Sequence, residues 1–98
     1  MRVEVLGPAE AEFREAVQHY NLQSEGLGYE FAAEVRRALS RIVRFPEAWS
    51  PLSPRTRRCR TNRFPYGIIY QLRGDKVLVV GVMHMRRQPG SWRTRLNQ

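Results

Sequence analysis

The 98-residue sequence has little of what metal or disulfide chemistry uses. It holds one cysteine, Cys59, and two histidines, His19 and His84. A single cysteine excludes an intramolecular disulfide and a cysteine-rich zinc site, and two distant histidines have no metal-ligand spacing. No run approaches the roughly 18 apolar residues of a membrane span, and the N-terminus has no signal-peptide pattern. We therefore expect a cytoplasmic protein with no metal, no cofactor and no membrane contact.

Acidic residues are nearly missing from the second half of the chain. Residues 1–47 carry eight acidic and six basic side chains, whereas residues 48–98 carry Asp75 against eleven basic ones, a balance of +10. Sixteen of the seventeen basic residues are arginine, whose planar guanidinium suits phosphate or carboxylate recognition. This basic half predicts an anionic partner, either nucleic acid or an acidic protein segment. The arginine content of a GC-rich genome is the alternative explanation.

Hydrophobic periodicity predicts a single α+β domain over residues 1–98, in the order β-α-α-β-β-β. Residues 2–6 alternate as a short first strand. Two apolar stripes at helical spacing, with a polar break at 21–28, predict a helical hairpin over 8–44. Glu10 and Glu12 would favour the positive end of the first helix. We expect the hairpin to cover one face of a small, mainly antiparallel sheet.

Residues 55–87 predict a three-stranded basic sheet region, and residues 88–98 a tail with a last helical turn anchored by Trp92. Aromatic and branched residues at every second position of 64–72 predict one buried strand face. Gly74-Asp75 is a tight turn, and the apolar run 77–83 indicates a central strand. Five arginines in 55–63 favour an edge strand. Alternation there places Arg58 and Arg60 on one face and Arg57 and Cys59 on the other.

These segments, in this order and spacing, resemble the RelE/ParE superfamily of bacterial toxins. The most specific pieces are residues 63–70 (RFPYGIIY), Gly74-Asp75 and residues 82–92 (VMHMRRQPGSW). The resemblance covers nearly the whole chain and implies a toxin of a type II toxin–antitoxin module, of the kind linked to plasmid stabilization. It also implies neutralisation by a cognate antitoxin, which in this family often carries a partly disordered, acidic segment.

The superfamily contains two activities of different classes. RelE-like members are metal-independent ribonucleases that cut mRNA on the ribosome. Their pattern places basic residues on the second strand, which here are Arg58 and Arg60, and an arginine at the end of the fourth, here Arg87. The third-strand arginine of the pattern falls on Gly67, and the tail tyrosine falls near Trp92 and Arg93, neither of which has a hydroxyl. Proton-transfer groups are therefore missing from the pattern.

His84 is the one candidate general base, since the unperturbed pKa of histidine is near neutrality. Strand alternation predicts that His84 shares a face with Val80 and Val82, where a buried or tail-contacting role is the commoner one. An arginine, whose pKa lies above about 12, clamps phosphate better than it carries protons. If the protein is a ribonuclease, its catalytic residues are expected to be Arg58, Arg60, His84 and Arg87.

ParE-like members inhibit DNA gyrase, break no bond themselves and need only a binding surface, so the sequence favours the ParE-like branch. A RelE-like nuclease and a diverged, non-toxic member are the alternatives. The expected partners are a cognate antitoxin and either gyrase or the ribosome with its mRNA. The predicted target- or antitoxin-binding surface comprises Arg57, Arg58, Arg60, Arg63, Arg86, Arg87 and Trp92.

Overall fold

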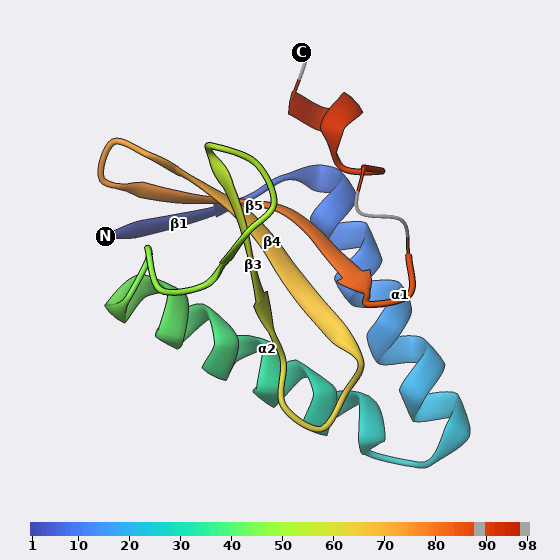
Figure 1. Cartoon of the computed structure of the whole chain (residues 1–98). Helices are drawn as coiled ribbons and strands as arrows, with labels where there is room; N and C mark the ends of the chain where they lie inside the picture. Colours follow the sequence, from blue (N-terminus) through green and yellow to red (C-terminus); the bar gives the residue numbers. More distant parts are fainter. Residues whose placement is uncertain (88–89, 97–98) are drawn as a thin grey trace.

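The computed structural model describes residues 1–87 and 90–96. Five strands form one sheet in the order β1-β5-β4-β3-β2, in which β1 runs parallel to β5 and all other neighbours are antiparallel. Two helices cover one face, and a short 3₁₀ helix, η1, lies near the other (Figure 1). The predicted α+β class and mainly antiparallel sheet are confirmed. The elements are β1 (Arg2–Val5), α1 (Gly7–Gln23), α2 (Leu27–Arg44), β2 (Ser50–Pro51), β3 (Thr56–Arg60), β4 (Tyr66–Arg73), β5 (Lys76–His84) and η1 (Arg93–Leu96).

The connection between the two helices is shorter than the sequence predicts. α1 continues to Gln23 and α2 begins at Leu27, so the predicted polar break at 21–28 is wrong in length. Asn21 lies within α1, and its side-chain oxygen accepts a hydrogen bond from the Gly28 N–H at 2.7 Å, which links the two helices. A Cβ atom at Gly28 would lie 2.1 Å from the Val17 carbonyl oxygen, so only glycine permits this helix crossing. Over the described residues, neither helix is long and apolar enough to cross a membrane.

The main core lies between the helical hairpin and the sheet. Phe31, Ile42 and Ile68 are fully buried there. The predicted face of the 64–72 strand is confirmed, because Phe64, Tyr66, Ile68, Tyr70 and Leu72 all belong to this layer. Phe31 packs edge-to-face against both Phe64 and Tyr66, which joins α2 to β4.

A bulge in β5 changes which face its side chains occupy. Ile69 pairs with Gly81 and Tyr70 with Val79, so Val80 is left between two registers. Val80 consequently lies in a second apolar cluster on the far face, whereas Val82 faces the helices. The expectation that His84 shares a face with both Val80 and Val82 is therefore wrong for Val80.

The second face of the sheet is covered by the tail. Trp92, which is 2 % exposed, packs there with Ile69, Leu78 and Val80, and Leu96 of η1 adds to the cluster. The predicted helical turn and its Trp92 anchor are confirmed.

β3, the strand with Arg57, Arg58 and Arg60, does not lie at the edge of the sheet. β3 pairs with β4 on one side and with the two-residue β2 on the other, through Ser50 opposite Arg58 and Pro51 opposite Arg57. The predicted edge position of this strand is wrong, because β2 lies outside it. Pro51 suits the outer position, since proline has no N–H to offer a further strand.

Candidate functional site

The first group of candidate residues lies on the tail face of the sheet. Arg58 and Arg60 alternate with the core residue Cys59, as predicted, and Arg60 pairs with Gly67 of β4. A Cβ atom at Gly67 would lie 2.8 Å from Cγ and Cδ of Arg58 and 3.2 Å from Sδ of Met85. The stem of Arg58 therefore occupies the space above β4 that a side chain at position 67 would need.

Within residues 1–87 and 90–96, Arg58 has no hydrogen bond or ion pair with a side chain that could transfer a proton. Its Nε atom is buried and has no hydrogen-bond partner among the described residues. Arg60 is exposed, and its carbonyl oxygen accepts a hydrogen bond from Arg41 of α2 at 2.9 Å. Two guanidinium groups suit an anionic partner, and the contacts found within residues 1–87 and 90–96 place neither an acid nor a base beside them.

His84 and Arg87 lie on the helix side, away from Arg58 and Arg60. The His84 ring is 5.4 Å from the Tyr66 ring, and its Nδ1 accepts a hydrogen bond from the Arg86 N–H at 3.1 Å. Both residues line a hollow of about 300 Å³ against α1 that also contains Glu15 and His19. Burial raises the pKa of Tyr66 in this hollow, and the nearby Glu12 carboxylate raises it further.

Glu12 of α1 ties this side of the molecule together. Its carboxylate, 13 % exposed, accepts hydrogen bonds from Arg87 at 2.7 Å and from both terminal nitrogens of Arg95 at 2.8 and 3.0 Å. It also accepts the Val82 N–H at 3.1 Å, while Arg95 donates to the Val80 carbonyl at 2.9 Å. Because β1 pairs with β5 only as far as Val79, Glu12 and Arg95 satisfy backbone groups of β5 beyond the end of β1.

The remaining predicted surface residues are distributed over the molecule. Trp92 is buried beneath the tail, with the Arg93 guanidinium 4.8 Å from its ring centre. Arg63 forms an ion pair with Glu30 of α2 at 2.8 Å, and Arg86 is exposed. The structure therefore places Arg58, Arg60 and Trp92 on the tail face, with Trp92 buried there, and places Arg57, Arg63 and Arg87 elsewhere.

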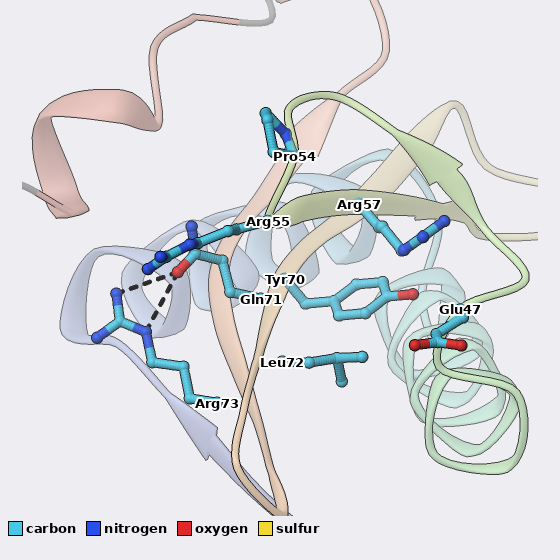
Figure 2. Close-up of a pocket in the computed structure, with 8 residues that line it drawn as sticks. All are labelled: Glu47, Pro54, Arg55, Arg57, Tyr70, Gln71, Leu72 and Arg73. Atoms are coloured by element: carbon cyan, nitrogen blue, oxygen red, sulfur yellow. Dashed lines mark hydrogen bonds between the residues drawn. The ribbon is translucent and has the colours of Figure 1, made fainter.

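A second group of arginines, missed by sequence analysis as a site, surrounds a cavity of about 520 Å³ at the β2–β3–β4 end of the sheet. Figure 2 shows Arg55 and Arg73 near the Gln71 amide, with Arg57 over the Tyr70 side chain and Glu47 beyond it. The pairing of β3 with β4 brings these arginines together, because it places Arg57 opposite Tyr70 and Thr56 opposite Gln71. Predicting this site required the strand pairing as well as the strands.

Tyr70 forms the wall of this cavity and is fully buried. Its hydroxyl donates to the Pro46 carbonyl oxygen at 2.5 Å. Burial raises the pKa of Tyr70 to about 12, with Arg57 opposing the rise. The phenol is therefore a neutral hydrogen-bond donor at physiological pH. Over residues 1–87 and 90–96, no group of histidine, cysteine, aspartate and glutamate side chains is arranged to hold a metal ion.

Comparison with known proteins identifies the family. Residues 3–89 match the family described as the ParE toxin of the type II toxin–antitoxin system, parDE. No curated protein matches the chain. A solved structure titled "Chromosomal ParDE TA system from P. aeruginosa" is similar at 14 % identity with a TM-score of 0.74, over 86 % of this chain and 95 % of that one. The resemblance drawn from the sequence is confirmed on its ParE side.

Proposed function

The chain belongs to the ParE family of toxins from type II toxin–antitoxin systems, and we propose that it inhibits growth by binding a target, without cleaving RNA. The proposed target is of the DNA gyrase class, and a cognate antitoxin would neutralise the toxin. The observation that carries this proposal is the separation of Arg58 and Arg60 from every candidate base. His84, the general base considered from the sequence, lines the hollow against α1 on the helix side of the sheet.

RNA cleavage without a metal needs a group that removes the 2′-hydroxyl proton and a group that protonates the leaving oxygen. On the tail face, the position of the superfamily's third-strand arginine is Gly67, covered by the Arg58 stem. The residue near the tail-tyrosine position, Trp92, is buried and has no hydroxyl. These features support a binding role for the two arginines and argue against a nuclease.

The charge distribution supports an acidic antitoxin segment as the partner of this face. The second half of the chain has one acidic residue against eleven basic ones. Replacing Arg58 and Arg60 together by Glu should weaken antitoxin binding, measured by isothermal titration calorimetry. The matched control replaces Arg2 and Arg14 by Glu, which changes the net charge equally at exposed positions outside this face. Equal affinity of both double variants would refute the assignment of the surface.

The decisive test of the function is inducible expression in bacteria with separate pulse labelling of DNA and protein synthesis. We expect an early stop in DNA synthesis with an SOS response while translation continues. An early stop in translation, with mRNA cut within translated codons, would replace the proposal with a RelE-like nuclease. Unimpeded growth, with the protein shown to be folded and abundant, would indicate a non-toxic member of the family.

A further inference from the structure

We propose that the cavity bounded by Arg55, Arg57 and Arg73 binds the phosphate group of a small phosphorylated molecule the size of a mononucleotide. The Arg55–Arg73 end of this cavity lies at the opposite end of the β3–β4 pair from Arg60 and Gly67, and the proposal does not depend on the cellular target. It rests on three observations: how two of the guanidinium groups are held, which charges surround them, and the size of the cavity.

The first observation is that neutral oxygens hold two of the guanidinium groups in place. Nε and one terminal nitrogen of Arg73 donate to the Gln71 side-chain oxygen at 3.2 and 3.0 Å. The Gln71 amide nitrogen in turn donates to the buried Thr56 hydroxyl at 2.9 Å, which fixes the orientation of the amide. Arg57 donates to the Trp49 carbonyl at 2.8 Å. Each of these two arginines keeps further N–H donors, and their positions are set before any ligand arrives.

The second observation is the lack of an ion-pair partner for these three cations among residues 1–87 and 90–96. Over the part of the chain that the structure describes, no carboxylate lies within ion-pair distance of Arg55, Arg57 or Arg73, so none of the three charges is neutralised by direct contact. Glu47 also lines the cavity, so the ionised groups around it sum to two positive charges.

The position of that excess charge indicates where an anion would bind. Figure 2 shows Glu47 on the Arg57 side of the cavity, beyond the Tyr70 hydroxyl, whereas Arg55 and Arg73 lie by the neutral Gln71 amide. The Arg55–Arg73 end is therefore the more positive one. A phosphate monoester carries a charge of about −1.5 to −2 at neutral pH, which matches this excess better than one carboxylate does. Guanidinium groups also match phosphate oxygens in geometry, because their N–H donors form a planar fork.

The third observation is size. A volume of about 520 Å³ lies within the range of small-molecule sites, about 300–1,000 Å³, and greatly exceeds what one phosphate ion fills. The remaining space, toward Arg57, Glu47 and the wall formed by Tyr70, offers both hydrogen-bond donors and an acceptor. These groups suit a polar remainder such as a sugar or a base. The cavity therefore fits a phosphorylated metabolite better than a bare anion.

The test uses the full-length protein and adenosine 5′-monophosphate as the probe, titrated by calorimetry at constant ionic strength set with chloride. We expect saturable binding that inorganic phosphate competes for and adenosine does not. Arg73→Gln and Arg55→Gln should each raise Kd by about tenfold or more, since each removes a charge-assisted contact. Arg14→Gln, an equal loss of charge on exposed α1, should leave Kd within about twofold.

Two readouts place binding at this cavity and exclude a loss of folding. In NMR spectra, the Gln71 side-chain amide and the Arg73 Nε–H signals should shift with the probe, because these groups contact each other beside the proposed phosphate. The melting temperatures of the two pocket variants should stay near that of Arg14→Gln. Saturable binding that the pocket variants leave unchanged would overturn the proposal. So would binding of a single-stranded oligonucleotide, but not the mononucleotide, because the site would then recognise a nucleic-acid backbone.

Discussion

Replacing Glu12 by Ala should destabilise the protein more than any other single removal of a carboxylate. The Glu12 carboxylate is the acceptor for Arg95, Arg87 and the Val82 N–H, so the change leaves three donors without this partner. Arg95 is 14 % exposed and Glu12 is 13 % exposed, so water replaces the lost contact only in part. The tail should consequently loosen from α1 and from the β5 edge.

The magnitude follows from how deeply each contact is buried. Breaking a fully buried ion pair costs about 3–5 kcal/mol, and the slight exposure of Arg95 and Glu12 reduces this to about 2–4 kcal/mol. Arg87 is 49 % exposed, so its contact adds less than about 1 kcal/mol. We therefore expect a loss of about 3 kcal/mol, which in a domain of this size lowers Tm by roughly 12–24 °C.

The assay is denaturant unfolding followed by a double-mutant cycle of Glu12→Ala with Arg95→Ala. The coupling energy between the two changes should reach at least about 2 kcal/mol. Glu10→Ala is the matched control on the same helix, since its ion pair with Arg14 is exposed and should contribute less than about 1 kcal/mol. In a Trp49→Phe background, Glu12→Ala should also shift the emission of the buried Trp92 to longer wavelength. A coupling energy below about 0.5 kcal/mol would show that the network does not hold the tail.

Three further predictions concern the core and its two faces. Because burial raises the pKa of Tyr70 from 10.0 to about 12, the folded state favours the neutral phenol. The contribution of Tyr70 to stability should be fully present well below pH 10, and about 2–3 kcal/mol of it should be lost as the pH rises from 10 to 12. Denaturant unfolding across pH 8–12 measures this, and a Tyr70→Phe variant that keeps the same alkaline loss would contradict the assignment. Gly28→Ala should prevent the close helix crossing, because the added Cβ meets the backbone of α1. We expect the free energy of unfolding to fall by more than about 2 kcal/mol. A Tm within a few degrees of the parent protein would show that the helices can separate freely. Trp92→Ala should cost about 3–5 kcal/mol of unfolding free energy, measured by thermal melting, whereas lost growth inhibition at unchanged stability would reveal a target contact.

Elements with strong local patterns could be predicted from the sequence. Alternation in 64–72 identified the buried face of β4, and the unbroken apolar run of 77–83 predicted an interior strand; β5 is one, although its neighbours β1 and β4 were not predicted. Gly74, at φ 62°, forms the predicted turn, since Arg73 and Lys76 pair directly across it. In each case the residues that decide the structure are neighbours in the chain, so their pattern is visible without the fold.

Features that depend on pairing between distant segments could not be predicted in this way. β2 has only two residues, too few for any periodicity, yet it moves β3 away from the sheet edge. The bulge opposite Ile69 and Tyr70 reverses the parity of β5, so simple alternation places Val80 on the wrong face. The arginine cavity likewise depends on the register of β3 against β4, which a charge count over 55–63 does not contain.

The Glu12 network shows how a charged residue acquires its role from strand length. As a sequence feature, Glu12 is a carboxylate near the start of α1, where it would favour the helix dipole. β1 has four residues and β5 has nine, so part of the β5 edge has no strand beside it. Glu12 and Arg95 bond to the Val82 N–H and the Val80 carbonyl at that edge, in place of a longer β1. Side chains from both ends of the chain thus complete the sheet. The same contact between Glu12 and Arg95 also holds the tail on α1.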